Sequence, residues 1–217
     1  MLFSLNDIRR FSIVAGDNTY PVDDVFVDLN SWSVTYISVD LGGFLNAETV
    51  LIGLDKLGQP DTAERTWAAE IDEDMLRAAP NWDEATGVLP ETGQGVLLAK
   101  TGDAQGAGAK VTPLGRASQL HNLPIMGTDG EIGAQDDFLF DADTAKISHI
   151  VIDNGRVLPG RQLVVDIESV RRLAADGTHF VVNIDGKTLN DAPQIEETDL
   201  ASRSWIEMIR SYYQLPI

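Results

Sequence analysis

The chain has 217 residues, of which 43% are hydrophobic and 23% charged; this balance is ordinary for a globular protein and excludes a collagen-like or wholly disordered chain. It contains no cysteine, which excludes disulfides, thiolate metal sites and a cysteine nucleophile. The 16 Lys and Arg residues oppose 34 Asp and Glu residues, so the net charge is −18, and nucleic acids and anionic lipid surfaces are poor partners.

The start of the chain and its apolar runs bear on location. Residues 1–7 lack the basic start and the apolar run of a signal peptide. No stretch reaches the ~20 apolar residues that a membrane helix needs. We therefore expect a soluble, cytoplasmic protein that does not insert directly into a membrane.

The first half of the chain is predicted to consist mainly of strands. Apolar runs bounded by turn residues indicate three of them: Val22–Leu29, Val34–Asp40 and Thr49–Leu54. Turns at Asn30-Ser31 and Gly42-Gly43 separate these strands. A short helix is predicted over Asp72–Ala79, because an aspartate caps its start, acidic residues follow in the first turn and Pro80 stops it.

The second half follows a glycine-rich linker, residues 101–113. Strands are predicted over Gln135–Asp141 and Ile147–Asp153, with an aspartate-rich turn between them. Asp185–Ala192 repeats the capped short helix of the first half. A C-terminal helix is predicted over Ser202–Tyr213, where apolar residues recur on one face at the helical period.

The two halves match one another residue by residue. A shift of 113 positions aligns residues 23–84 with the second half without gaps, and upstream of this segment the offset is one residue smaller. The shift places Asp23-Asp24 on Asp136-Asp137 and Ile71-Asp72 on Ile184-Asp185. Because chance rarely preserves one register over so long a stretch, the sequence predicts a tandem duplication.

Several segments of both repeats carry a family resemblance. They are Val39–Leu45 (VDLGGFL), Val50–Leu57 (VLIGLDKL), Leu123–Gly133 (LPIMGTDGEIG), Asp137–Asp141 and His149–Asp153. These segments resemble the PRC-barrel family, which includes the cytoplasmic domain of the photosynthetic reaction-centre H subunit and one domain of a ribosome maturation factor. The resemblance implies a small β-barrel for each repeat and a role in holding macromolecules together, with no common catalytic residues.

The fold prediction combines the pattern with the resemblance. We expect a mainly β protein of two tandem small antiparallel β-barrels, PRC-barrel-like, with short helices and a C-terminal helix. The first repeat is predicted to occupy residues 1–100 and the linker 101–113. The second repeat, with the C-terminal helix, takes residues 114–217.

The titratable residues predict neither a metal nor a catalytic site. The three histidines lack the spacing of metal ligands and are interpreted as structural or surface residues: His121, His149 and His179. Three aspartates near one turn offer oxygen ligands for calcium, but their spacing favours turn capping: Asp137, Asp141 and Asp143. Asp40 and Asp153 precede glycines and are also predicted to cap turns.

No motif for an enzyme or a bound cofactor is present. The chain has no nucleophile elbow, no P-loop and no dinucleotide fingerprint. We therefore predict no catalytic residues and no cofactor. The candidate contacts with a partner are aromatic residues: Trp32, Phe44, Trp205, Tyr212 and Tyr213. Trp32 stands on a turn, as a lid on the barrel end or as a contact residue, where the second repeat has Ala145.

The functional prediction is a non-enzymatic protein-binding adaptor or assembly scaffold. The resemblance suggests a protein partner within a photosynthetic or other membrane complex, which this protein would approach from the cytoplasmic side. Association into a homo-oligomer is an open alternative. One alternative is a small-ligand or ion-binding regulator, with a cleft between the repeats lined by residues such as Asp137, His149 or Arg161. Another is a ribosome-assembly factor that binds a basic ribosomal protein.

Overall fold

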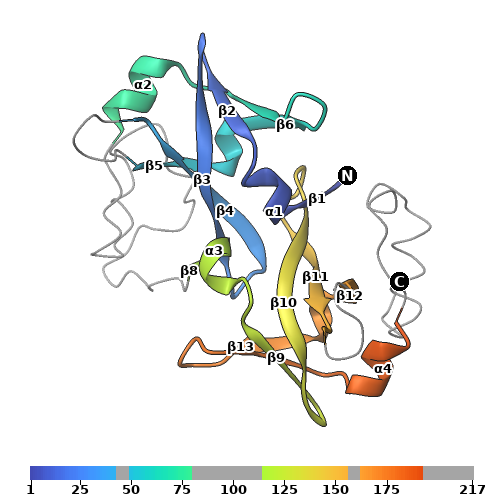
Figure 1. The fold of residues 1–217 in the computed structure, drawn as a ribbon. Helices are drawn as coiled ribbons and strands as arrows, with labels where there is room; N and C mark the ends of the chain where they lie inside the picture. The colour runs from blue at the N-terminus through green and yellow to red at the C-terminus, as the bar shows by residue number, and fades with distance from the viewer. Residues whose placement is uncertain (43–48, 80–113, 156–161, 193–217) are drawn as a thin grey trace. The chain divides into compact units, whose positions relative to one another are not determined.

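The computed structural model describes residues 1–42, 49–79, 114–155 and 162–192 (Figure 1). The chain folds into two compact units, each with most of its contacts within itself. Unit 1 consists of Met1–Leu5, Ser31–Ser33 and the chain from Ser118 onward. Unit 2 consists of Asn6–Asn30 and Val34–Ala117.

Unit 2 is built on one seven-stranded sheet in the order β5-β4-β3-β2-β7-β6, with β8 also paired to β3. Its strands are β2 (Ser12–Ala15), β3 (Asn18–Asp28), β4 (Ser33–Asp40), β5 (Thr49–Gly53), β6 (Leu57–Asp61), β7 (Thr66–Ala69) and β8 (Leu114–Arg116). Its helices are α1 (Leu5–Ile8), the 3₁₀ turn η1 (Leu54–Lys56) and α2 (Glu73–Ala78).

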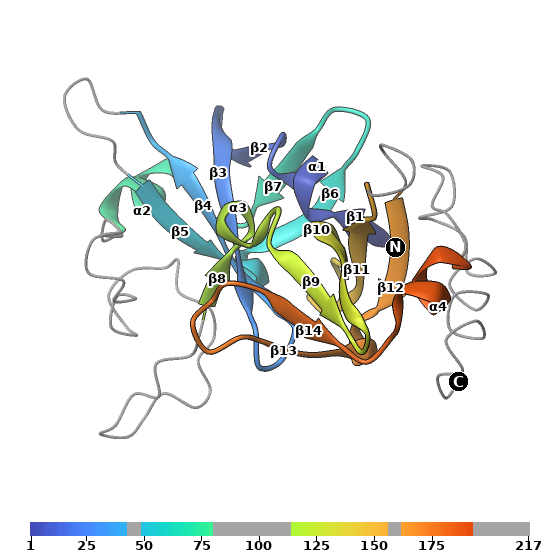
Figure 2. The same cartoon turned by 60° about the horizontal axis from the view of Figure 1, so that its bottom comes forward.

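Unit 1 has the same arrangement, in the order β12-β11-β10-β9-β14-β13, with β1 also paired to β10 (Figure 2). Its strands are β1 (Leu2–Ser4), β9 (Pro124–Gly127), β10 (Gly130–Asp141), β11 (Ile147–Asp153), β12 (Gln162–Asp166), β13 (Val170–Leu173) and β14 (Phe180–Val182). Its helices are α3 (Ala117–Leu120), η2 (Ile167–Ser169) and α4 (Gly186–Asn190).

The predicted fold class is confirmed: the protein is mainly β, with two tandem barrel-like sheets and short helices. Within the described residues, β2 pairs with β7 and β9 with β14 in parallel, and the hairpins β2–β3 and β9–β10 are antiparallel. The long strands β3 and β10 begin upstream of their predicted starts. The first residues of both strands lack an apolar run, and those of β3 are mostly exposed, but they pair with β2 and β9 in hairpins.

The first strand of each repeat completes the sheet of the unit built by the other repeat. In unit 1, β1 pairs with β10, so that Leu2 lies opposite Asp141. In unit 2, β8 pairs with β3, so that Leu114 lies opposite Asp28. Leu2 and Leu114 are equivalent in the duplication, as are Asp28 and Asp141. The two exchanged strands, β1 and β8, therefore take the same register in both units.

A β-bulge explains why the offset between the repeats changes by one residue. The β2–β3 hairpin has an uninterrupted register. In the β9–β10 hairpin the register shifts between Glu131 and Gly133, which leaves Ile132 as the extra residue. The offset is 112 before Ile132 and 113 after it.

The two cores use equivalent positions. Ile13 in β2 and Ile125 in β9 are both fully buried, as are Trp67 in β7 and Phe180 in β14. The Trp67 indole is wholly enclosed and donates a hydrogen bond from Nε1 to the Gly58 carbonyl at 2.7 Å. Each such side chain contributes about 1.5–3 kcal/mol through removal of apolar surface from water, so both units have cores of their own.

Both predicted short helices are present with their aspartate caps. Asp72 accepts a hydrogen bond from the Met75 amide at 2.8 Å, and Asp185 from the Thr188 amide at 2.6 Å. In residues 1–42, 49–79, 114–155 and 162–192, no helix combines the length and the apolar character needed to cross a membrane. The predicted linker (101–113) and C-terminal helix (202–213) lie outside the described residues.

Candidate functional site

Trp32 is held in a fixed position in unit 1. Its φ is +48°, a left-handed conformation that the equivalent Ala145 shares with a φ of +60°. The Trp32 carbonyl accepts a hydrogen bond from the Ile147 amide at 2.9 Å. Its indole packs against Phe138 and Phe180, with ring centroids 5.9 and 6.2 Å away, and those two rings meet edge to face. The half-buried indole thereby contacts two buried rings.

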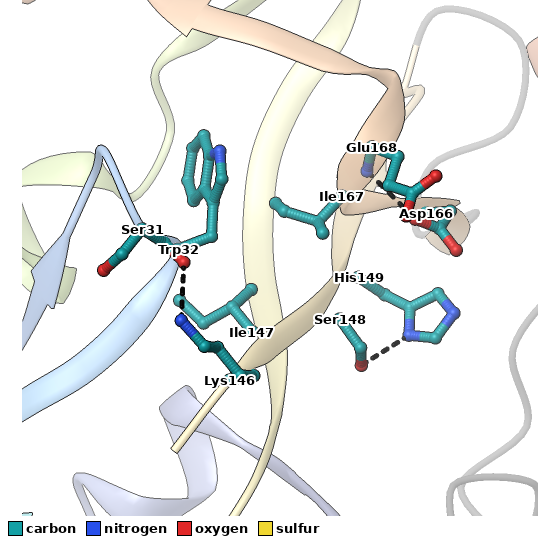
Figure 3. A pocket seen from close by; sticks show the side chains of 9 residues that line it. All are labelled: Ser31, Trp32, Lys146, Ile147, Ser148, His149, Asp166, Ile167 and Glu168. Atoms are coloured by element: carbon teal, nitrogen blue, oxygen red, sulfur yellow. Dashed lines mark hydrogen bonds between the residues drawn. The ribbon is translucent and has the colours of Figure 1, made fainter. Parts of the chain in front are cut away.

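Beside this ring lies a pocket of about 350 Å³ within unit 1 (Figure 3). The turn before β4 supplies one side of it, the start of β11 the floor, and the end of β12 with η2 the other side. We call it the Trp32 pocket, and its lining residues are Ser31, Trp32, Lys146, Ile147, Ser148, His149, Asp166, Ile167 and Glu168.

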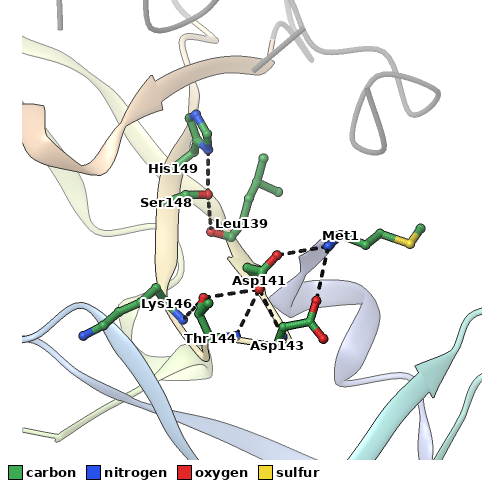
Figure 4. Close-up of polar contacts among 8 residues, drawn as sticks. All are labelled: Met1, Leu139, Asp141, Asp143, Thr144, Lys146, Ser148 and His149. Atoms are coloured by element: carbon green, nitrogen blue, oxygen red, sulfur yellow. Dashed lines mark hydrogen bonds and ion pairs between the residues drawn. The ribbon is translucent and has the colours of Figure 1, made fainter. Parts of the chain in front are cut away.

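A bulge in β11 brings two neighbouring side chains of the pocket together. The β10–β11 register passes from His149 to Ile147, so Ser148 is the extra residue. Neighbouring residues of a regular strand point to opposite faces, and a bulge re-aims one of them. Here the Ser148 hydroxyl lies 2.8 Å from His149 Nδ1 and 3.4 Å from the Leu139 carbonyl (Figure 4). The buried imidazole, 1% exposed, is held in one orientation.

Two carboxylates form the acidic side of the pocket. Asp166 lies directly across the strand pair from His149 and is 3% exposed. One of its oxygens accepts a hydrogen bond from the Glu168 amide at 2.9 Å, which fixes the η2 turn. Glu168 itself is exposed. Lys146 is directed to the turn that carries Trp32, where its ammonium donates to the Ser31 carbonyl at 3.2 Å.

The equivalent positions of the other repeat carry different chemistry. Where the second repeat has His149 and Asp166, the first has Tyr36 and Gly53. Tyr36 is buried among apolar side chains, and this burial, together with the charge of Asp55, raises the pKa of its hydroxyl. The same sheet therefore forms without a buried imidazole or a buried carboxylate at these places. Since burying polar groups is costly, the Trp32 pocket holds chemistry that the fold does not require.

Of the three aspartates predicted to cap the turn after β10, Asp141 does so, while the Asp143 carboxylate lies 4.0 Å from the Met1 amino group. Asp141 accepts hydrogen bonds from the amides of Asp143 and Thr144, both at 3.0 Å, and pairs with the Met1 amino group at 3.0 Å (Figure 4). Burial raises the pKa of Asp141, but the bonds from the amino group and Thr144 outweigh it, so the pKa lies below its usual value. Asp40 caps its turn through the Gly42 amide at 2.9 Å. Within the described ranges, no cluster of three or more His, Asp or Glu side chains suits a metal ion.

Some of the predicted site residues lie in the described part of the chain, and others lie outside it. Trp32 and His149 line one pocket. Asp137 does not line this pocket and instead accepts hydrogen bonds from the Ser4 hydroxyl and the Phe138 amide. Asp153 has a buried Oδ1 without a hydrogen-bond partner in the described part of the chain, and residues 156–161, which follow it, lie outside that part, so its capping role stays a prediction. Phe44, Arg161, Trp205, Tyr212 and Tyr213 lie outside the described residues.

Sequence reasoning missed the acidic side of the pocket. Asp166 and Glu168 were not predicted as site residues, and the available signal was their place in the duplication. Asp166 replaces Gly53 and Glu168 replaces Asp55, so the first is a change of residue class and the second is not. Reading the two repeats for their differences, as well as for their matches, points to Asp166.

Fold and pocket together define a class: a mainly β protein of two barrel-like units, one of which carries a pocket with an aromatic side and an acidic side. No family model matches the chain, and no curated protein matches it.

Proposed function

We propose that the protein is a non-enzymatic, protein-binding adaptor or assembly scaffold of the PRC-barrel kind, and that the Trp32 pocket is where its partner binds. The observation that supports this proposal is the difference between the repeats at His149, Asp166 and Trp32, against Tyr36, Gly53 and Ala145. A supported aromatic ring beside polar groups is the kind of anchor that carries much of the energy of protein interfaces.

The resemblance also suggests where the partner is found. The family includes a domain that covers the cytoplasmic side of a photosynthetic complex, so we propose a protein of a membrane complex as the partner. A surface with the charge of this chain favours a partner with basic residues, because unlike charges raise the rate of encounter.

A pull-down with matched variants tests the proposal. The tagged full chain is incubated at low salt with an extract of its native host, and bound proteins are identified by mass spectrometry. We expect one stoichiometric partner, which Trp32→Ala loses and Met75→Ala retains. Met75 is the control because its side chain is also partly exposed, at 37%, and belongs to unit 2.

The folded state of each variant is checked by circular dichroism and thermal unfolding. If the bait binds nothing, or if Trp32→Ala and Met75→Ala bind alike, the Trp32 pocket is not the binding site for a partner protein.

A second candidate function is regulation by a small ligand, and the size of the Trp32 pocket favours it. Its volume of about 350 Å³ lies at the lower end of the range of small-molecule sites, about 300–1,000 Å³. A panel of metabolites and divalent ions would then raise the midpoint of thermal unfolding of the wild-type protein and not of Trp32→Ala. Absence of any shift across the panel rejects this candidate.

A further inference from the structure

We infer that the Trp32 pocket binds a side chain of one kind, an arginine that projects from the partner protein. This inference rests on the proposed function and adds the chemistry of the occupant. Three features of the pocket support it: a supported aromatic face, carboxylates across from that face, and space for one long side chain.

The aromatic face is organised before any ligand arrives. The Trp32 carbonyl accepts a hydrogen bond from the Ile147 amide, and Phe138 and Phe180 pack against the indole ring. A guanidinium group stacks on the face of tryptophan better than on other aromatic rings, and a ring that is already ordered loses little entropy on binding. The half-buried state of Trp32 leaves part of its ring accessible.

The charges across the pocket favour a cation. Asp166, Ile167 and Glu168 line the side of the pocket away from Trp32, and the Ile167 side chain lies between the Trp32 ring and the two carboxylate groups (Figure 3). Lys146 supplies the opposing charge, but its ammonium is directed to the Ser31 carbonyl on the other side. Carboxylates bind guanidinium through charge-assisted hydrogen bonds, and the net charge of −18 attracts a basic segment from a distance. An anionic ligand would face two carboxylates and the field of the whole chain.

The experiment compares two peptides that differ only in charge. The uniformly ¹⁵N-labelled full chain is titrated with acetylated, amidated Gly-Arg-Gly, and separately with the same peptide containing citrulline, which has the shape of arginine without its charge. The signal of the Trp32 indole N–H is followed by NMR. The chain has four tryptophans, and Trp32→Phe identifies the relevant signal by its loss.

We expect the arginine peptide to move the Trp32 signal in a saturable way, and the citrulline peptide to bind about tenfold more weakly, since it lacks both the cation–π and the ion-pair contribution. The affinity for the arginine peptide falls as salt is raised.

Two variants with the same net charge separate the pocket from long-range attraction. Glu168→Gln removes the exposed carboxylate of the pocket, and Asp55→Asn removes its equivalent in the first repeat. We expect Glu168→Gln to weaken arginine binding about threefold, as for an exposed ion pair, and Asp55→Asn to leave it unchanged. Both positions lie at 3₁₀ turns, so neither change removes core packing.

The outcomes distinguish this inference from the proposed function. Equal binding of the arginine and citrulline peptides, equal loss in both charge variants, or no movement of the Trp32 signal overturns the inference. If the pull-down still depends on Trp32 while the arginine peptide fails to bind, the pocket binds a partner of other chemistry and only this inference is wrong. If both experiments fail, the proposed function is wrong as well.

Discussion

The exchanged strands of the two units are anchored at equivalent positions by different chemistry. In unit 2, Arg116 of β8 donates from Nε to a carboxylate oxygen of Asp24 at 2.9 Å. In unit 1, the equivalent residue of β1 is Ser4, whose hydroxyl donates to Asp137. Asp24 and Asp137 are themselves equivalent. At this equivalent position, the aspartate of β3 binds a guanidinium group and the aspartate of β10 binds a hydroxyl group.

The anchor of unit 2 is a charged cluster. Asp24 is fully buried, and a second cation, Arg9, lies 3.5 Å from its other carboxylate oxygen. Arg116 also reaches Asp23 at 3.4 Å and lies over the Phe26 ring at 5.7 Å. Two guanidinium groups thus offset the cost of one buried carboxylate.

In the anchor of unit 1, Ser4 and His121 stand at the positions equivalent to Arg116 and Arg9. Asp137 is only partly buried and accepts hydrogen bonds from Ser4 and, at 2.8 Å, from the Phe138 amide. The residue equivalent to Arg9 is His121, whose ring nitrogen meets the Asp136 carbonyl at 2.9 Å. The comparison teaches that the aspartate is tied to the exchanged strand, while its partner varies with how deeply the carboxylate is buried.

The largest expected effect comes from converting the anchor of unit 2 into that of unit 1. Arg116→Ser leaves the buried Asp24 with Arg9 as its remaining cation in the cluster, and we expect a loss of about 3 kcal/mol in the free energy of unfolding. Urea denaturation measures it. Arg10→Ser is the control, because Arg10 is 66% exposed and its ion pair with Asp7 contributes under about 1 kcal/mol. Equal stability of the two variants would refute the ionic anchor.

The next effect tests the bulge at Ile132. A Cβ on Gly127 would lie 2.6 Å from the Ile184 carbonyl oxygen and 2.9 Å from Ile132. The equivalent residue Ala15 carries such a Cβ, fully buried, beside a hairpin without a bulge. We expect Gly127→Ala to cost about 1–3 kcal/mol through overpacking.

The control for this prediction is a glycine replaced where there is room. A Cβ on Gly58 meets its nearest atom at 3.7 Å, so Gly58→Ala is expected to change the free energy of unfolding little. If Gly127→Ala unfolds at the same urea concentration as Gly58→Ala, the bulge does not crowd this position.

A smaller effect is expected at the anchor of unit 1. Ser4→Ala removes the hydroxyl that donates a hydrogen bond to Asp137, and a bond of this kind contributes about 1 kcal/mol to the free energy of unfolding. The same urea titration measures the loss, with Thr62→Ala as an exposed hydroxyl control. The comparison predicts the order Arg116→Ser, then Ser4→Ala, then the controls; a Ser4 variant less stable than the Arg116 variant would reverse our interpretation of the two anchors.

The smallest effect concerns the equivalent helix caps and their dependence on pH. Hydrogen bonds from the amide and hydroxyl of Thr188 lower the pKa of Asp185. A lowered native pKa gives stability that is present above the unfolded pKa, about 3.9, and is lost as pH falls through the native value. We expect Asp185→Ala to lower the midpoint of thermal unfolding by a few degrees at neutral pH.

At acid pH we expect the wild-type protein and Asp185→Ala to have similar midpoints of thermal unfolding, because the Asp185 carboxyl of the wild type is then protonated and caps α4 poorly. The midpoint of thermal unfolding of Asp72→Ala, which removes the equivalent cap of α2, is measured at neutral pH for comparison with that of Asp185→Ala. A difference between wild type and Asp185→Ala that persists unchanged to low pH would exclude the charged cap.

The sequence alone determined the features that depend on neighbouring residues. The duplication, the main apolar strands, the Asp72 and Asp185 caps and the Asp141 turn all follow from local spacing and from one register kept along the chain. The strands, caps and turn are decided by residues within a few positions of one another, so periodicity and turn chemistry suffice to find them. The duplication is found by comparing the chain with itself.

Tertiary structure decided which distant segments meet. Neither β1 nor β8 was predicted from the sequence, and three residues of local sequence do not indicate that each pairs with the long strand of the other repeat. The offset of one residue was visible in the sequence, yet only hydrogen-bond register assigned it to Ile132. Trp32 was named from its turn, whereas its neighbours Phe138, Phe180 and Asp166 come from strands far along the chain. Pairing partners are chosen by packing over long sequence separations, which a local pattern does not encode.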